Sequence, residues 1–263
     1  MAERNSKLRP VVLSIAGHDP SSGAGVTADI KTIAAQGCYG VTCITSLTVQ
    51  STRGVKSVEP VEGRVITETL EELMSDVEIA AVKIGMLGSA EAARAVSGFL
   101  RRYQPRHVVL DPVLKSSSGA VLLSRDALLI LKERLLGMVA VITPNADEAA
   151  ALTGLTVNTL DEMGTAAVRL REAGARNVIV TGGHLDPPCD LISPAGGSGF
   201  VTLVGTKIVA RSTHGTGCAF STAVACKLAQ GKNLTTAAKA AKAYVEAALA
   251  NPPILGRGVG PIV

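Results

Sequence analysis

The run His214-Gly215-Thr216-Gly217-Cys218 places two glycines, a threonine and a cysteine directly before a long apolar segment. Glycines in such a turn leave backbone N–H groups free, and a helix that follows adds its own unpaired N–H groups and the positive end of its dipole. These groups would hold an anion, above all a phosphoryl group in a transition state. A cysteine in the first helical turn is expected to have a lowered pKa and to accept a proton as its thiolate. The alternative is a plain strand-to-helix turn around a small buried cysteine.

A second glycine-rich loop, Gly17–Gly25, leads into a segment that carries Asp29. It matches neither the dinucleotide fingerprint nor the Walker motif, because the G-K-[ST] signature is absent. Backbone groups of this loop could hold a small substrate while Asp29 orients a hydroxyl group or a ring nitrogen. The alternative is a helix entry whose acidic residue only complements the helix dipole.

Two further loops offer oxygen ligands. Asp111 follows a buried strand and suits Mg²⁺ or a phosphate-bound water, and the next residues, Leu114–Gly119, supply Lys115, three serines and a glycine as a flap over phosphates. Asn145 and Glu148 follow the next strand and would bind Mg²⁺-coordinated water beside a triphosphate, although a helix N-cap explains them equally well. Four such loops at one edge of one sheet favour phosphoryl transfer.

Positioning these loops requires a parallel sheet, and the alternation of strand-like and helix-like runs predicts one. Short β-branched runs that are apolar on both faces are typical of strands covered on both sides. The predicted strands are Val11–Ala16, Val41–Thr45, Ala80–Ile84, His107–Leu110, Val139–Ile142 and Asn177–Val180. The predicted helices are Val26–Gln36, Val65–Ser75, Ala90–Tyr103, Arg125–Leu136, Ala146–Leu152, Asp161–Ala173, Cys218–Gln230 and Leu234–Leu249.

The chain is predicted to be one α/β domain over residues 1–263, with helices on both faces of a mostly parallel sheet. Its 47 % hydrophobic residues and 27 glycines suit a well-buried protein with many tight turns. Near the end, Phe200–Val204 and Lys207–Val209 are expected to form a hairpin around Gly205-Thr206. Ligands of such sheets bind at the carboxyl ends of the strands, where the loops above gather.

Composition excludes several classes of protein. The 26 Lys and Arg residues against 22 Asp and Glu are spread along the chain, and 2 % aromatic residues without Trp offer no base-stacking platform, so nucleic-acid binding is not expected. Five cysteines without a C-x-x-C pair indicate neither a disulfide framework nor a zinc site and favour a reducing compartment. The apolar run Val11–Ala16 is too short for the apolar region of a signal sequence, so none is expected, and no segment has 18 uninterrupted apolar residues. A cytoplasmic protein without a membrane partner is expected.

Longer strings carry a family resemblance. In order they are AGHDP at 16–20, GAG at 23–25, LTVQSTRGV at 47–55, VKIGML at 82–87, LDPV at 110–113, TPN at 143–145, GGH at 182–184, HGTGC at 214–218 and GxGxGP at 256–261. Over nearly its whole length the chain resembles the hydroxymethylpyrimidine/phosphomethylpyrimidine kinases of thiamine biosynthesis, in the ribokinase-like superfamily. The resemblance implies a ribokinase-like α/β fold, ATP and Mg²⁺, a small pyrimidine substrate and a homodimer.

The resemblance also implies a substrate pocket. Gly17, Asp29, Gln50 and Met86 would line it, with Gln50 bonded to ring or amino nitrogens, Met86 packed on the ring and Val113 in the same wall.

The resemblance further implies how the reaction is carried out. Cys218 would accept the proton of the hydroxymethyl group as its oxygen attacks the γ-phosphate, and backbone N–H groups from Gly215 to Cys218 would stabilise the transferring group. Asp111, Asn145 and Glu148 would organise Mg²⁺ and the phosphates. A second transfer, from monophosphate to diphosphate, is expected as in the relatives.

Three residues depart from the family's pattern. His18 stands where Ser is usual, Ser22 where Gly is common, and Thr181 at a nucleotide-site position often held by Lys. A threonine offers ATP phosphate no positive charge, so the departure concerns nucleotide affinity or acceptor preference.

Three alternatives stay open. A pyridoxine or pyridoxal kinase would act on a ring of similar shape with an equivalent hydroxymethyl group. A hydrolase with Cys218 as nucleophile needs a histidine base in reach, whereas His214 is expected to point away and the other histidines lie in unrelated loops. A catalytically silent vitamin-binding module is disfavoured by the intact Asp111, Asn145, Glu148 and Cys218.

Overall fold

The computed structural model describes residues 9–197 and 199–263. One sheet runs through these residues, with its strands in the order β3-β2-β1-β4-β5-β6-β7-β8-β9. The strands are β1 (Val11–His18), β2 (Tyr39–Ser51), β3 (Gly54–Pro60), β4 (Ile79–Ile84), β5 (Val108–Leu110), β6 (Val141–Ile142), β7 (Val178–Gly182), β8 (Cys189–Ser193) and β9 (Val201–Val204). The central strands are parallel, and β3, β8 and β9 join antiparallel at the two edges. The predicted mostly parallel sheet is confirmed.

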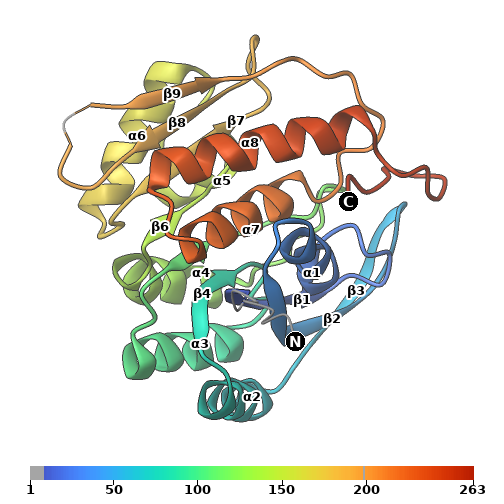
Figure 1. Ribbon diagram of the computed structural model, residues 1–263, viewed down its shortest axis with the longest axis vertical. Helices are drawn as coiled ribbons and strands as arrows, with labels where there is room; N and C mark the ends of the chain where they lie inside the picture. Colours follow the sequence, from blue (N-terminus) through green and yellow to red (C-terminus); the bar gives the residue numbers. More distant parts are fainter. Residues whose placement is uncertain (1–8, 198) are drawn as a thin grey trace, which may run out of the picture.

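Helices cover both faces of this sheet (Figure 1). They are α1 (Gly25–Ala35), α2 (Gly63–Asp76), α3 (Ala90–Tyr103), α4 (Arg125–Ile130), α5 (Ala146–Thr153), α6 (Leu160–Glu172), α7 (Thr216–Ala229) and α8 (Leu234–Ala250). Residues of α1, α7 and α8 pack on one face, and residues of α2 to α6 pack on the other. In residues 9–197 and 199–263, no helix combines the length and the apolar character that a membrane crossing needs.

The strands alternate between the two apolar layers. Leu13 and Ile15 of β1 face the α2–α6 side, whereas Val12 between them faces the α1–α7–α8 side. Ala81 of β4 likewise faces α1 and α7, and Lys83, two residues further along, points to that same side because side chains repeat every second residue. A lysine is thereby placed inside a core layer.

Most element boundaries fall within a few residues of the predictions, and α3 has the predicted bounds. The predicted hairpin is wrong: β9 pairs with β8, and Lys207–Val209 lies in a loop in which Val209 is 99 % exposed. The apolar residues of Lys207–Val209 have no neighbouring strand that would bury them. The helix predicted over Arg125–Leu136 changes after α4 into a π-helical turn, Leu131–Leu135.

Candidate active site

A cavity of about 510 Å³ lies at the carboxyl edge of the parallel strands, against the N-terminus of α7. We call it the acceptor cavity. Every residue predicted for the site lines it except Asp29: Gly17, Gln50, Met86, Asp111, Val113, Lys115, Asn145, Glu148, Thr181, Gly215, Thr216, Gly217 and Cys218. The sequence therefore identified which loops converge, and the structure adds how their side chains are held.

The first turn of α7 is shaped by a glycine. Gly215 is the N-cap residue with φ of 84°, and a Cβ there would lie 1.8 Å from the carbonyl oxygen of Gly23. The two glycine-rich loops thus touch through backbone that a side chain would force apart. No side chain within the described residues caps α7, and its first-turn residues Thr216, Gly217 and Cys218 line the cavity, so uncapped N–H groups are available there for an anion.

The predicted lowered pKa of Cys218 is wrong. Burial raises the pKa of its thiol to about 12, and the nearby Asp111 and Asp29 carboxylates raise it further. The charge of Lys83 and a hydrogen bond with the Gly25 backbone act in the opposite direction but do not prevail. Desolvation and two negative neighbours therefore outweigh the Lys83 charge and the backbone hydrogen bond, which favours the thiol form at neutral pH.

Asp29 lies beneath the cavity and not in its lining. Its side chain is fully buried and accepts hydrogen bonds from Ser14 Oγ at 2.5 Å and Thr222 Oγ1 at 2.8 Å. Lys83 Nζ lies 2.9 and 3.0 Å from its two carboxylate oxygens. With both oxygens occupied, Asp29 is the counter-ion of a buried lysine.

Lys83 was not singled out from the sequence, although an apolar strand that holds one lysine requires a buried anion beside it. Burial lowers the pKa of Lys83, but the negative charges of Asp29 and Asp111 hold it above its ordinary value. The ammonium group is therefore a fixed positive charge beneath the first turn of α7.

Asp111 and Glu148 fit a divalent cation. Both are buried, and both line the acceptor cavity. Burial raises the pKa of Glu148 to about 8 with the negative charge of Asp111 as the next cause, and burial likewise raises the pKa of Asp111. Two mutually repelling carboxylates are suited to Mg²⁺, which takes one or two protein carboxylates and completes its shell with phosphates and water. The described residues hold no cluster of three or more His, Cys, Asp or Glu ligands.

Asn145 and Glu148 also form the capping box of α5. Asn145 Oδ1 accepts from the Glu148 N–H, and Glu148 Oε2 accepts from the Asn145 N–H, both at 2.9 Å. The same two residues thus form the helix cap and line the cavity, because the capping hydrogen bonds hold both side chains at the cavity wall. Thr181 of β7 lies beside this turn and donates its N–H to Pro144 O at 2.9 Å.

The predicted flap is a short hairpin over the cavity. Ser116 N–H donates to Ala120 O at 2.8 Å, and Leu122 N–H donates to Leu114 O at 2.9 Å. Lys115 lies at the start of this hairpin with an exposed side chain that reaches the cavity lining. The residues of Leu114–Gly119 are thereby held beside the acceptor cavity.

The substrate wall includes a close backbone approach. A Cβ on Gly17 would lie 2.9 Å from Met86 Sδ, so glycine lets the Met86 side chain lie against the first loop. Thr45 Oγ1 donates to Met86 O at 2.6 Å and fixes the start of that loop. An aromatic ring in the cavity would meet the Met86 thioether there.

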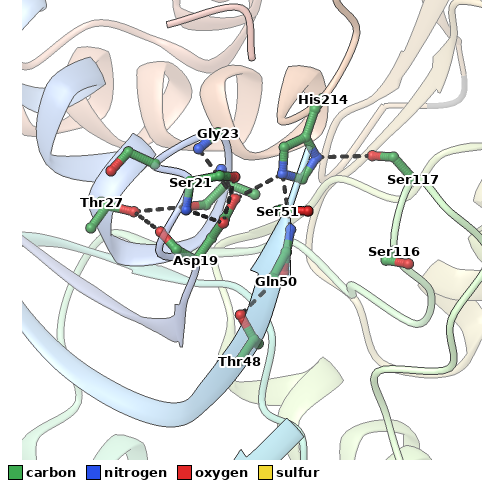
Figure 2. A network of polar contacts seen from close by, with 12 residues as sticks. Asp19, Ser21, Gly23, Thr27, Thr48, Gln50, Ser51, Ser116, Ser117 and His214 are labelled. Atoms are coloured by element: carbon green, nitrogen blue, oxygen red, sulfur yellow. Dashed lines mark hydrogen bonds and ion pairs between the residues drawn. The ribbon is translucent and has the colours of Figure 1, made fainter. Parts of the chain in front are cut away.

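Figure 2 shows a polar network on the same wall that the sequence did not reveal. His214 Nε2 lies 2.8 Å from Asp19 Oδ2 and 3.1 Å from the amide of Gln50, and His214 Nδ1 lies 3.2 Å from Ser117 Oγ of the flap. The ring faces the acceptor cavity but bonds these residues and not Cys218. The pairing that a cysteine hydrolase needs is therefore not formed by His214.

A second cavity, of about 650 Å³, meets the first at the N-terminus of α7. We call it the donor cavity. The two cavities share residues from the start of α5, from β7 and from the start of α7: Asn145, Asp147, Thr181, Thr216 and Gly217. Phe220, Val245 and Leu249 give the donor cavity an apolar wall. Charged residues of both signs complete the lining, among them Lys207 and Lys242, of which Lys242 pairs with Asp190 at 2.9 Å. The apolar residues lie beyond the first turn of α7 and on α8, outside the motifs that the sequence analysis recognised.

The chain is similar in sequence to known proteins over most of its length. The family model for phosphomethylpyrimidine kinase matches residues 19–263. A hydroxymethylpyrimidine/phosphomethylpyrimidine kinase of Haemophilus influenzae is 42 % identical over 95 % of this chain and 94 % of its own. A thiamine biosynthesis bifunctional protein of Geobacter sulfurreducens is 42 % identical over 97 % of this chain, which spans 52 % of that protein.

The fold has solved counterparts as well. The ADP complex of a Bacillus subtilis pyridoxal kinase superposes with a TM-score of 0.87 at 31 % identity, over 96 % of each chain. The predicted ribokinase-like architecture is thereby confirmed.

Proposed function

The chain belongs to the phosphomethylpyrimidine kinase family, and from that premise we propose that it transfers the γ-phosphoryl group of ATP to 4-amino-5-hydroxymethyl-2-methylpyrimidine. We propose the resulting monophosphate as acceptor for a second transfer, which gives the diphosphate. The observation that carries the proposal is the meeting of two cavities at the uncapped N-terminus of α7. A phosphoryl group that passes from one cavity to the other crosses that anion site.

In this proposal the pyrimidine occupies the acceptor cavity. Met86 packs on the ring, Gly17 and Val113 flank it, and Gln50 bonds its nitrogens. Asp29 acts from below: it holds Lys83, whose charge favours anions at the first turn of α7. The closed floor of Asp29, Lys83 and Thr222 leaves no path for the ring to move deeper.

The nucleotide occupies the donor cavity, with its base against Phe220 and Val245 and its phosphates toward Thr181 and Gly217. Asp111 and Glu148 would hold Mg²⁺, which neutralises phosphate charge when bound. Lys115 reaches the same end of the acceptor cavity from the flap.

Cys218 is proposed as the proton acceptor. The hydroxymethyl oxygen forms a bond to the γ-phosphorus, the bond from that phosphorus to the β,γ-bridging oxygen breaks, and ADP leaves with the electron pair. The hydroxyl proton passes to Cys218 Sγ. Because burial raises the pKa of this thiol to about 12, the thiolate that the step needs is a minor form in the free protein, and the Lys83 charge favours it.

The test is ADP release with Mg-ATP and four separate acceptors: the hydroxymethylpyrimidine, its monophosphate, pyridoxine and pyridoxal. Turnover of both pyrimidines, with mono- and diphosphate products identified by mass, supports the proposal. Turnover of the pyridines alone overturns the substrate and keeps the kinase. Hydrolysis of an acyl ester without nucleotide would instead support a cysteine hydrolase.

A pyridoxal kinase is the second candidate, because the Bacillus subtilis protein that superposes at a TM-score of 0.87 bears that name. The same assay separates the two. A homodimer is proposed as well. Leu47 and Val49 of β2, 50 % and 53 % exposed, offer apolar surface for it, and sedimentation equilibrium measures its mass.

A further inference from the structure

The Asp19–His214–Gln50 network has a definite direction of hydrogen bonding, which starts from Asp19. This carboxylate is 3 % exposed and accepts from Ser21 N–H and Ser21 Oγ–H on Oδ1, and from the N–H groups of Gly23 and Ala24 on Oδ2. Burial raises the pKa of Asp19, but the hydrogen bonds from His214 and Ser21 outweigh it and leave the pKa below its ordinary value. Asp19 is an ionised carboxylate that can only accept.

His214 Nε2 must therefore carry a hydrogen. It lies 2.8 Å from Asp19 Oδ2, and a carboxylate at that distance needs a donor opposite it. The result is the same for neutral His214 with its proton on Nε2 and for the doubly protonated ring. Ser117 Oγ, 3.2 Å from Nδ1, can either donate or accept and so fits both forms.

The proton on His214 Nε2 determines the orientation of the Gln50 side-chain amide. As drawn in Figure 2, its nitrogen lies 3.1 Å from His214 Nε2, which sets two donors against each other. The other end of the amide lies 3.2 Å from Thr48 Oγ1, whose one hydrogen makes the shorter bond to His18 O at 2.9 Å. Thr48 Oγ1 thus has a lone pair to offer and faces an oxygen. A turn of the amide by 180° about its terminal bond relieves both conflicts: its NH₂ group then donates to Thr48 Oγ1, and its Oε1 shares the one hydrogen of His214 Nε2 with Asp19 Oδ2 in a three-centre bond. The two ends of a glutamine are assigned from such networks.

We propose that His214 is a specificity-determining residue: it fixes the Gln50 side chain with Oε1 toward His214 and the NH₂ group toward Thr48, so that the acceptor cavity recognises a ring edge with a donor beside an acceptor. This inference rests on the proposed function. The exocyclic amino group and adjacent ring nitrogen of a 4-aminopyrimidine form such an edge. The 4-oxo counterpart presents the reverse pattern, an acceptor beside a ring N–H, and meets a wrongly paired amide.

The experiment compares the dissociation constants of the 4-amino pyrimidine and its 4-oxo counterpart by calorimetry without nucleotide, so that turnover plays no part. For the wild-type protein we expect the amino form to bind about ten-fold or more tightly, since one mispaired buried group costs that much. His214→Leu removes the donor and leaves the amide only its bond to Thr48, whose hydroxyl group can donate or accept and so allows both orientations of the amide. The preference should then fall to within about three-fold. His214→Gln restores an N–H near the place of Nε2 and should keep most of the preference.

A merely structural role for His214 would weaken both ligands equally, so an unchanged preference in His214→Leu overturns the proposal. A wild-type protein that binds both pyrimidines equally also overturns it, while the proposed function stands. Binding of neither pyrimidine overturns the proposed function and this inference with it.

Neutron crystallography of the wild-type protein gives a reading that needs no variant. One deuterium on His214 Nε2 and the Gln50 ND₂ group toward Thr48 are expected. An ND₂ group that points at His214 overturns the assignment.

Discussion

The acceptor and donor cavities meet at the same helix but differ in how their polar groups are held. In the acceptor cavity the polar groups are buried and paired: Asp19 is 3 % exposed and His214 is 8 % exposed, and Lys83 beneath the cavity is fully buried. The donor cavity is mixed: Lys242 pairs with the buried Asp190 at 2.9 Å, whereas Lys207 pairs with Asp186 at 2.6 Å through side chains that are mostly exposed. Buried, fully paired networks discriminate between ligands, whereas exposed pairs contribute little. Because the larger buried network lies on the acceptor side, we expect most of the chemical selectivity there.

The largest effect is expected from removing the buried charge under the acceptor cavity. Lys83→Met leaves the buried Asp29 carboxyl group without its counter-ion, and the free energy of unfolding should fall by about 3–5 kcal/mol. Urea denaturation measures it. The matched change Lys239→Met, at an exposed position of α8, should stay within about 0.5 kcal/mol. Combining Lys83→Met with Asp29→Asn should restore part of the loss, and a double variant no more stable than the single one would contradict the pairing.

The next largest effect concerns the reaction. Cys218→Ala should lower kcat about 100-fold or more, with the dissociation constant of the pyrimidine nearly unchanged, as expected for loss of a general base. Steady-state kinetics and calorimetry measure the two quantities. Cys43→Ala makes the same chemical change at a buried cysteine of β2 that lines neither cavity, and it should leave kcat within about two-fold. Undiminished turnover in Cys218→Ala would remove the thiol from the mechanism.

The pKa of Cys218 gives a third test. Burial raises this pKa to about 12, so the thiolate fraction is small at pH 7 and grows about ten-fold per pH unit up to at least pH 9. The rate of Cys218 alkylation by iodoacetamide, followed by peptide mass spectrometry, should rise in the same way and stay below that of a free thiol. A rate that levels off below pH 8 would show that the helix N-terminus outweighs burial after all.

The smallest effect is expected on the donor side. Val245→Ala removes two methyl groups from the apolar wall and should raise the KM for ATP about three- to ten-fold while the KM for the pyrimidine stays constant. Val65→Ala on α2, which lines neither cavity, serves as control. A change in the KM for the pyrimidine of similar size would mean that the two cavities are not separate in function.

The sequence predicted the loops of the site well because glycines, strand-end acids and helix caps are local signals. It predicted α3 with its bounds for the same reason: Ser89 caps its start, and its apolar face repeats with the helical period. The antiparallel edge was predicted poorly. β8 lies between proline-rich loops, and its pairing with β9 depends on contacts that no short pattern encodes.

The sequence also failed to predict side-chain properties that depend on burial. Asp29 was predicted to touch substrate, and the thiol of Cys218 was predicted to be acidic, because both residues follow glycine-rich loops. The Asp29 outcome depends on Lys83, which lies far from it in sequence and reads as an ordinary strand residue, and the Cys218 outcome depends on burial. A position's distance from water, which decides a pKa, is a property of the assembled layers and not of its neighbours in the chain.

The late position of α7 in the chain has a consequence for synthesis on the ribosome. Strands β1 and β4 and helix α1 emerge first, with Asp29 and Lys83 among them, while α7, which covers that face of the sheet and supplies Thr222, follows more than a hundred residues later. Until α7 has been synthesised, the apolar side chains of Val12, Ala81 and Val109 lack the helix that covers them. The Asp29–Lys83 ion pair is then exposed to solvent. Nascent chains of this length are therefore expected to engage chaperones, and the anion site forms only when nearly the whole domain has been made.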